Sequence, residues 1–205
     1  MKMLEQSAVD FISALSSNAP VPGGGGASAA VGALSAALGM MVTNLTIGKK
    51  KYADYEEDLM HARASLEDLR DRLIDLTDKD AEAFEPLSRA YSLPKDAPDY
   101  ERIMEEALVT ASLTPLDIMS TVLECAQVLE ELVEKGSRLA ISDVGVGIFF
   151  AQAAIEGASL NVYINTKMMK DKDRAQELNN RADAIIREGA ALKEKIAAAT
   201  MAVIR

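Results

Sequence analysis

Residues 59–90 read LMHARASLEDLRDRLIDLTDKDAEAFEPLSRA, and their apolar positions follow one another at alternating steps of three and four. This spacing places the apolar residues on one face of an α-helix, in the heptad pattern of helices that pack against each other. The seam consists of Leu59, Ala62, Leu66, Leu69, Leu73, Leu76, position 80, Ala83, Leu87 and Ala90. The stretch therefore predicts a long helix that is buried along one side.

One seam position carries a charge. Asp80 stands where the pattern calls for an apolar residue, and an unpaired carboxylate in an apolar environment is strongly destabilising. Such a residue is either a catalytic or substrate-orienting carboxylate in a cleft, or a polar residue that sets the helix register beside a Lys or Arg. We favour the cleft.

The rest of the chain shows helical spacing too, and it shows no strand-like alternation of apolar and polar residues. We therefore predict an all-α fold, a multi-helix bundle with a Gly-rich loop between the first two helices, as a single domain over residues 1–205. Besides the seam helix, which ends before Pro94, helices are predicted over residues 2–16, 27–47, 99–135, 142–169 and 173–203.

Two of these predicted helices are almost free of charge. Residues 27–47 carry no formal charge and are long enough to span a membrane. Their small residues, such as Gly32 and Gly39, favour close packing against other helices instead, so we predict a buried central helix. Residues 142–169 are apolar on nearly every side, and this pattern predicts that they are buried as well.

Composition excludes several classes of function. The formal net charge is −10, from 22 Lys and Arg against 32 Asp and Glu, which argues against binding to nucleic acid or anionic membranes. With one cysteine, Cys125, and one histidine, His61, the chain lacks a disulfide framework and the usual ligands for zinc. The first ten residues do not resemble a signal peptide, so we expect a cytoplasmic protein.

Residues 17–26 form the predicted Gly-rich loop, with Pro20, Pro22 and the run Gly23–Gly26. The run lacks the spacing and the preceding strand of a Walker or Rossmann motif. Backbone N–H groups at the start of the following helix, together with the Ser28 hydroxyl, suit an anion or a polar ring edge. The other interpretation is a close-packed turn.

Further polar residues have two interpretations each. Asp143 suits a helix N-cap or a second site carboxylate, and Glu156 in the apolar fifth helix suits a loop contact or a second subunit. Asn161 and Asn165, one turn apart, suit ligand binding or interior hydrogen bonds. Lys49–Lys51 suits a solvated helix end, or a patch near the Gly-rich loop that attracts an anion.

Three blocks of the sequence resemble one known family. They are PVPGGGGASAAVGALSAALGMMVTNLTIGKKKY (residues 20–52), DKDAEAFEPLSRAYSLPK (78–95) and ISDVGVGIFFAQAAIEGASLNVYIN (141–165). In this order they resemble the formiminotetrahydrofolate cyclodeaminase and methenyltetrahydrofolate cyclohydrolase family. The resemblance implies an all-helical, commonly dimeric enzyme that acts on a tetrahydrofolate derivative. The sequence departs from many relatives at Gly26, where they have Ser.

The resemblance implies acid–base chemistry without a metal or redox cofactor. In the cyclodeaminase reaction, which we expect, N10 of 5-formiminotetrahydrofolate attacks the formimino carbon and ammonia leaves, giving the 5,10-methenyl product. The alternatives are the cyclohydrolase, which hydrolyses that methenyl bridge to 10-formyltetrahydrofolate, and a non-catalytic helical scaffold.

The implied roles fall on named residues of this chain. Asp80 would transfer protons, and Asp143 would assist it or hold the pterin. Lys49 and Lys50 would attract the anionic glutamate tail. The remaining substrate-binding candidates are Gly23, Gly24, Gly25, Ser28, Asn44 and Asn161.

Overall fold

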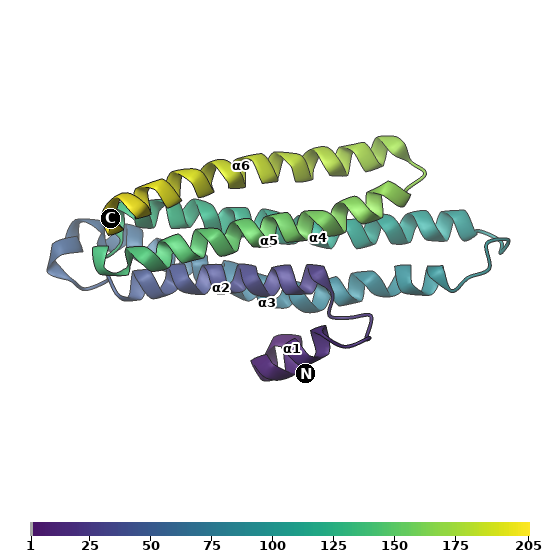
Figure 1. The fold of residues 1–205 in the computed structure, drawn as a ribbon, viewed down its shortest axis with the longest axis horizontal. Coiled ribbons are helices and arrows are strands. Elements are labelled where there is room, and N and C mark those ends of the chain that lie inside the picture. The colour runs from purple at the N-terminus through teal and green to yellow at the C-terminus, as the bar shows by residue number, and fades with distance from the viewer. Residues whose placement is uncertain (1) are drawn as a thin grey trace.

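A computed structural model describes residues 2–205, and these residues form helices joined by short connections, with no strand among them (Figure 1). The long helices are α1 (Ala8–Leu15), α2 (Gly24–Asn44), α3 (Glu56–Tyr91), α4 (Tyr100–Lys135), α5 (Ile141–Met168) and α6 (Lys172–Ile204). Short 3₁₀ helices are η1 (Met3–Glu5), η2 (Lys50–Tyr55) and η3 (Arg138–Ala140). The predicted all-α fold is confirmed.

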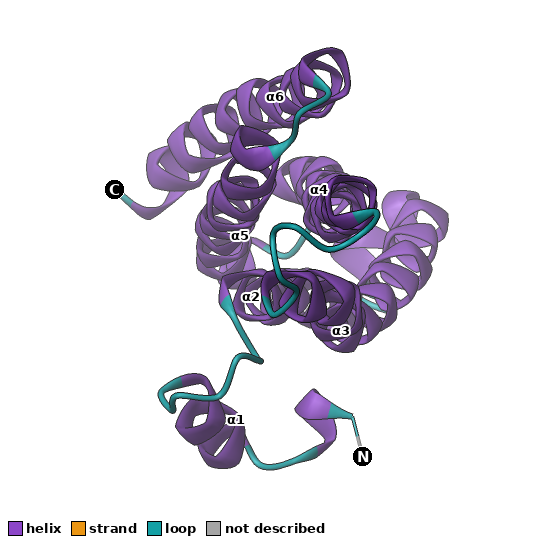
Figure 2. Ribbon diagram, turned by 90° about the vertical axis from the view of Figure 1, so that its right-hand side faces the viewer, coloured by secondary structure: helices purple, strands orange, loops and turns teal. Residues whose placement is uncertain are grey.

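Helices α2, α3, α4 and α5 pack around one core, and α6 covers α5 and α4 (Figure 2). The seam of α3 faces this core as predicted, because Leu59, Leu66 and Leu73 are fully buried. Asp80 lies on the same side of α3 and is half-buried. Helix α3 runs from residue 56 to 91 without interruption although Pro86 lies inside it.

Small residues let α2 occupy the centre of the bundle. A Cβ atom at Gly32 would lie 2.6 Å from Cγ2 of Val122, and one at Gly39 would lie 2.8 Å from Cδ1 of Leu66. Such distances are shorter than van der Waals contact, so the neighbouring helices approach the α2 backbone closely only because a side chain is missing there. The predicted close packing of this helix is confirmed.

Three helical segments have membrane-like length and composition. They are α2, α4 and Arg138–Met168, with mean hydropathy of 1.2 to 1.5 over their most apolar windows. Between 56% and 61% of each window is buried inside the bundle. Contacts with neighbouring helices therefore account for much of their apolar character.

The N-terminal prediction of one helix over residues 2–16 is wrong. The chain forms η1 first, and α1 begins only after Ser7, whose hydroxyl accepts a hydrogen bond from the Asp10 N–H at 3.1 Å as an N-cap. Helix α1 stands apart from the bundle (Figures 1 and 2). Its apolar side chains are therefore largely exposed, including Ile12 at 62%, and in α1 only Phe11 is buried.

Two further predictions need correction. The glycine run is not wholly a loop, because Gly24–Gly26 forms the first turn of α2. Helix α5 is not buried on every side, since Phe149, Leu160 and Ile164 are each more than half exposed. Periodicity predicts a buried face only when apolar residues gather on one side, and α5 is apolar on all sides.

Candidate active site

The candidate site is a cleft at the N-terminus of α2. Figure 1 shows α3, α4 and α5 continuing beyond the point where α2 begins. The space next to the first turn of α2 is a cleft of about 150 Å³. Its lining comes from four segments: Pro20, Val21, Gly23, Gly24, Asp80, Phe84, Ala111, Pro115, Asn161, Ile164 and Asn165.

Asp80 is the only ionisable residue in this lining. The backbone N–H of Gly26, in the first turn of α2, donates a hydrogen bond of 2.9 Å to its Oδ2 atom. Burial raises the pKa of the Asp80 carboxyl, and the Gly26 hydrogen bond offsets part of that rise. The carboxyl can thus change its protonation state closer to neutral pH than an exposed aspartate, as a proton-transfer group requires.

The glycine run lets the helix backbone meet this carboxylate. A Cβ atom at Gly25 would lie 2.2 Å from Oδ1 of Asp80, which is far inside van der Waals contact. A Cβ atom at Gly24 would lie 3.3 Å from Nδ2 of Asn161. Any side chain at position 25 would therefore push the Asp80 carboxylate out of its place.

Two amides form the α5 wall of the cleft. Asn161 donates its Nδ2 hydrogen bond to the Gly157 carbonyl at 3.1 Å, and Asn165 donates to the Ala111 carbonyl at 3.0 Å. Each bond holds the side chain in place and leaves the amide oxygen as an acceptor. With Asp80, the cleft therefore offers three oxygen acceptors for ring N–H donors.

Some lining residues gave no signal in the sequence. Phe84 lies outside the predicted seam, Ala111 suits an ordinary core position, and Pro20 and Val21 suit a loop. Asn165 lies one turn from Asn161 but is not among the predicted substrate-binding residues. Only the one-turn spacing of the two asparagines pointed to this wall.

The Ser28 hydroxyl does not line the cleft. It donates a hydrogen bond of 2.8 Å to the Gly24 carbonyl, and the side chain is buried next to Gly157. A Cβ atom at Gly157 would lie 2.7 Å from its Oγ atom. Ser28 thus packs α2 against α5, which is the close-packing interpretation.

Four other predicted residues lie at the opposite end of the bundle. Asn44 ends α2 and is exposed, followed by the exposed Lys49 and Lys50, whereas the cleft lies at the start of this helix. The 21 residues of α2 span about 30 Å. Asp143 lies in the first turn of α5, about 27 Å along the helix from Asn161.

The two ends of the bundle are too far apart for these residues to share one site within a single chain. Within one chain, the lysine patch does not lie near the glycine run, and Asp143 cannot reach Asp80. The expectation of one shared site failed because helical spacing does not show which ends of separate helices meet. Helices α2 and α5 run antiparallel, as the 2.8 Å hydrogen bond from Ser35 Oγ to the Gly147 carbonyl and the contact of Gly24 with Asn161 show.

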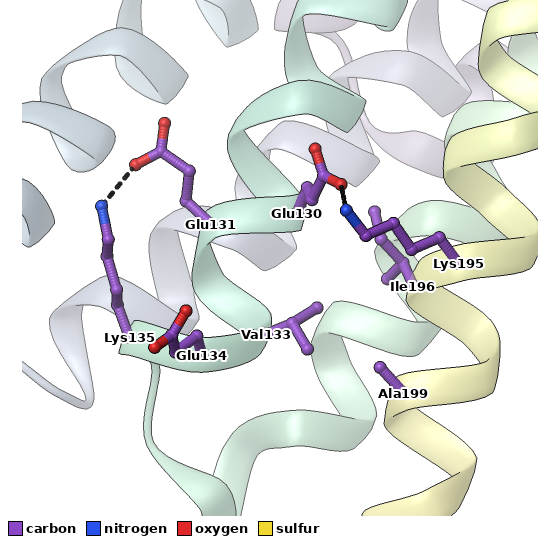
Figure 3. A pocket seen from close by; sticks show the side chains of 8 residues that line it. All are labelled: Glu130, Glu131, Val133, Glu134, Lys135, Lys195, Ile196 and Ala199. Carbon is purple, nitrogen blue, oxygen red and sulfur yellow. Dashed lines mark hydrogen bonds and ion pairs between the residues drawn. The ribbon is translucent and has the colours of Figure 1, made fainter.

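A larger groove between α4 and α6 has a different character. It measures about 380 Å³, and ion pairs neutralise its lysines: Lys195 with Glu130, and Lys135 with Glu131 (Figure 3). These charged groups are solvent-accessible and already paired, and ion pairs of this kind are common on protein surfaces.

Cys125 lies outside both sites. Burial raises the pKa of Cys125 to about 12, so this thiol is not a nucleophile.

Known proteins resemble the whole chain. The sequence profile of the formiminotransferase-cyclodeaminase family matches residues 7–184. A methenyltetrahydrofolate cyclohydrolase from Methylorubrum extorquens is 41% identical over 190 residues, which cover 91% of each chain. Mouse formimidoyltransferase-cyclodeaminase is 30% identical over 191 residues, 91% of this chain but only 35% of the mouse protein.

A solved structure shares the fold. The crystal structure of formiminotetrahydrofolate cyclodeaminase from Thermotoga maritima matches all of this chain and all of its own, with a TM-score of 0.93 and 27% sequence identity. The profile covers most of the chain, and the relatives align over nearly its full length. The protein therefore belongs to the formiminotransferase-cyclodeaminase family, whose members include cyclodeaminases and methenyltetrahydrofolate cyclohydrolases of folate one-carbon metabolism.

Proposed function

We propose that this folate one-carbon enzyme is a methenyltetrahydrofolate cyclohydrolase with Asp80 as its proton-transfer group. The observation that carries this proposal is the half-buried Asp80 carboxylate, held by the Gly26 N–H in a cleft with no other ionisable side chain. The Methylorubrum cyclohydrolase supports the choice of reaction, because the similarity covers 91% of both chains. The sequence alone had favoured the cyclodeaminase.

Hydrolysis needs one group that first accepts and then donates a proton. A water oxygen bonds to the methenyl carbon while its proton passes to Asp80. The bond from this carbon to N5 then breaks, Asp80 returns the proton to N5, and the new hydroxyl releases its own proton to solvent. The negative Asp80 also stabilises the positively charged methenyl bridge before attack. The oxygens of Asn161 and Asn165 accept hydrogen bonds from the pterin N–H groups.

The cyclodeaminase remains the second candidate, and the Thermotoga structure favours it with a TM-score of 0.93. That reaction forms a bond from N10 to the formimino carbon and breaks the bond to the departing ammonia. The same carbon and the same two nitrogens, N5 and N10, take part in both reactions, so the same cleft could serve either one. Neither route calls for a metal or redox cofactor, and we propose that the enzyme acts in the cytoplasm as a homodimer.

The methenyl chromophore distinguishes the two reactions. Purified protein is mixed with 5,10-methenyltetrahydrofolate or with 5-formiminotetrahydrofolate, and the absorbance is followed. We expect enzyme-dependent decay with the first substrate. Growth with the second and no accelerated decay with the first would establish the deaminase instead.

The role of Asp80 is tested with Asp80→Asn. Asparagine keeps the volume and hydrogen-bonding capacity but cannot carry the proton, so turnover should fall at least about 100-fold while folate binding persists. Circular dichroism and a binding titration serve as controls for folding and affinity. Turnover close to that of the unchanged protein would remove Asp80 from the proposed mechanism.

A further inference from the structure

The cleft at the start of α2 is small for a whole folate. Its volume of about 150 Å³ is below the roughly 300–1,000 Å³ typical of small-molecule sites. Its polar groups, Asp80, Asn161 and Asn165, suit the pterin, but its lining contains no cation for the carboxylates of the glutamate that every folate carries. The rest of the substrate must therefore contact another part of the surface if the proposed function holds.

A second cavity lies further along the same helices. It measures about 210 Å³, and its lining includes Lys95 of the α3–α4 loop, Tyr100 and Met104 of α4, and Met168 at the end of α5. Figure 1 shows the α3–α4 loop and the α5–α6 turn at one end of the bundle, beyond the start of α2. Each cavity alone is smaller than the usual small-molecule site, whereas the two together exceed the lower bound of that range.

The two cavities lie on the same faces of α4 and α5. On α5, Ile164 lines the cleft, and Met168, one turn further on, lines the second cavity. On α4, Ala111 lines the cleft, and Met104, seven residues earlier, lines the second cavity. Positions four or seven residues apart share one face of a helix. The second cavity therefore continues the line of the cleft, and seven residues of helix correspond to about 10 Å.

Tyr91 lies between the two cavities. It follows Phe84 of the cleft by seven residues on α3 and so shares its face. Its hydroxyl donates a hydrogen bond of 3.5 Å to the Met168 sulfur, and burial, together with the neighbouring Tyr100, raises the pKa of this hydroxyl. Met168 and Tyr100 both line the second cavity. The Tyr91 side chain is 49% exposed and a thioether is a weak acceptor, so little holds the ring in this position.

Lys95 supplies the second cavity with a positive charge that no acid neutralises. The other lysine of the lining, Lys170, forms an ion pair with Glu101. Glu105, the remaining acid of the lining, accepts hydrogen bonds from the backbone N–H groups of Lys170 at 2.8 Å and Asp171 at 3.0 Å. Within residues 2–205, Lys95 forms no ion pair. Its ammonium group is therefore available to a carboxylate of a ligand.

We infer that the second cavity binds the benzoylglutamate part of the folate, with the Tyr91 ring against the benzoyl ring and Lys95 at a carboxylate of the first glutamate. The identity of the ligand rests on the proposed function. A folate joins its pterin, its benzoyl ring and its glutamate in that order, and the cleft, Tyr91 and Lys95 follow the same order along the bundle. On binding, the Tyr91 ring leaves Met168 and packs on the benzoyl ring as aromatic pairs do.

Charge decides which end of the folate enters the second cavity. The reacting carbon joins N5 of the pterin to N10 of the aminobenzoyl group, so proton transfer at Asp80 places this middle part at the cleft. The pterin is neutral and its N–H donors suit the amide oxygens of Asn161 and Asn165, whereas the glutamate is anionic and suits Lys95. The reverse placement would bring the glutamate carboxylates towards the Asp80 carboxylate, and like charges repel.

Binding of three ligands tests the order of the subsites without any assay of activity. The ligands are tetrahydrofolate as the monoglutamate, tetrahydropteroyl amide, in which an uncharged amide replaces the glutamate, and 6-methyltetrahydropterin, which also lacks the benzoyl ring. Lys95→Gln should weaken the binding of tetrahydrofolate about fivefold at low salt, and less at high salt, because an exposed ion pair is lost. Binding of the other two ligands should not change. Equal losses for tetrahydrofolate and the amide, or no loss for either, would overturn the role of Lys95.

Lys195→Gln is the matched control for the charge. It removes the same charge from α6, where the side chain is 72% exposed and lines neither of these two cavities. Binding of tetrahydrofolate should be the same as in the unchanged protein. A loss as large as that in Lys95→Gln would show that only the net charge matters, and it would overturn the assigned subsite.

Tyr91→Ala and Tyr91→Phe test the position of the benzoyl ring. Removing the Tyr91 ring should weaken the binding of tetrahydrofolate and of the amide about tenfold, the upper range for an aromatic pair, and leave 6-methyltetrahydropterin unchanged. Phenylalanine keeps the ring, so Tyr91→Phe should bind all three ligands like the unchanged protein. Circular dichroism checks that each variant folds. No loss in Tyr91→Ala, or an equal loss for 6-methyltetrahydropterin, would overturn the role of this ring.

Failure of this inference and failure of the proposed function give different results. If the variants change binding as expected but the unchanged protein turns over neither the methenyl nor the formimino substrate, only the proposed function is contradicted. If the protein turns over one of them while binding ignores Lys95 and Tyr91, only the second cavity is contradicted. An unchanged protein that does not bind tetrahydrofolate would contradict both.

Discussion

At the scale of single residues, the site depends on one contact between a carboxylate and a helix terminus. Asp80 projects from the apolar seam of α3, and its Oδ2 atom accepts the Gly26 N–H. The Gly26 hydrogen bond favours the ionised form, while burial disfavours it. The second effect is larger, so the pKa of this carboxyl is raised.

The raised pKa predicts how Asp80 affects stability. A carboxyl whose pKa is higher in the folded than in the unfolded state binds its proton more tightly when folded, so the protein loses stability as pH rises from about 4 through the folded pKa. Asparagine does not ionise, so Asp80→Asn should raise the melting temperature at pH 7, and less so at pH 4. Thermal unfolding at both pH values measures this.

A control separates burial from net charge. Asp68→Asn removes one negative charge from an exposed position of the same helix. The increase at pH 7 should be larger for Asp80→Asn than for Asp68→Asn. The same or a smaller increase would show that burial does not control the Asp80 carboxyl.

Gly25 should also be sensitive to substitution, because its backbone lies against Asp80. In Gly25→Ala, the new methyl group would lie 2.2 Å from Asp80 Oδ1, so the carboxylate must rotate away and lose the Gly26 hydrogen bond. We expect turnover to fall about tenfold to 100-fold, the range of a misplaced catalytic group. Gly23→Ala is the comparison, because nothing lies within 4 Å of its Cβ position. Comparable losses in the two variants would argue against the clash.

At the scale of elements, the sequence of α2 meets two packing requirements. Its inner face needs glycine and alanine so that α3, α4 and α5 can approach, and its first turn needs glycine so that Asp80 fits. Glycine in a helix is unfavourable by about 1 kcal/mol relative to alanine. Tertiary packing therefore stabilises α2, because the intrinsic helix propensity of its sequence is weak.

The central packing predicts a large effect at Gly32. Gly32→Val adds atoms where Val122 already lies 2.6 Å from the Cβ position, so the free energy of unfolding should fall by about 3 kcal/mol. Ala191→Val, at an exposed position of α6, controls for the low helix propensity of valine and should cost about 0.5 kcal/mol. Urea denaturation measures both. A loss at Gly32 no larger than at Ala191 would mean that α3 and α4 are not tightly packed on α2.

At the scale of the whole molecule, the cleft and the Lys49–Lys51 patch lie at opposite ends of the bundle. The cleft end contains Asp80, and the other end contains Lys49–Lys51 in a protein of net charge −10. A patch of lysines in an acidic protein attracts an anionic group by its positive charge. Within one chain, the length of α2, about 30 Å, separates this patch from the cleft.

The lysines should distinguish folates by tail length. Neutralising them in Lys49→Ala/Lys50→Ala should weaken the binding of a polyglutamylated folate more than that of the monoglutamate, because the extra charges lie in the tail. The difference should shrink as salt is added, since the lysines are exposed. Titrations with both ligands at two ionic strengths measure it, and equal, salt-independent losses would rule out binding of the tail.

The sequence by itself determined the class and much of the layout of this protein. The periodicity of α3 predicted its buried seam, and Asp80 was recognisable because a charge interrupts that seam. The small residues of α2 predicted its central place. These features are local, because the spacing along one helix determines which residues share a face.

Only the tertiary structure decided which faces and ends meet. It showed that Gly24–Gly26 is helical and meets Asp80, that Asn165 joins the cleft, and that Asp143 lies at the other end of α5. It also showed that α5, apolar on all sides, keeps one stripe exposed. Periodicity carries no information on the direction in which separate helices pack, and a helix of uniform polarity has no preferred inner face.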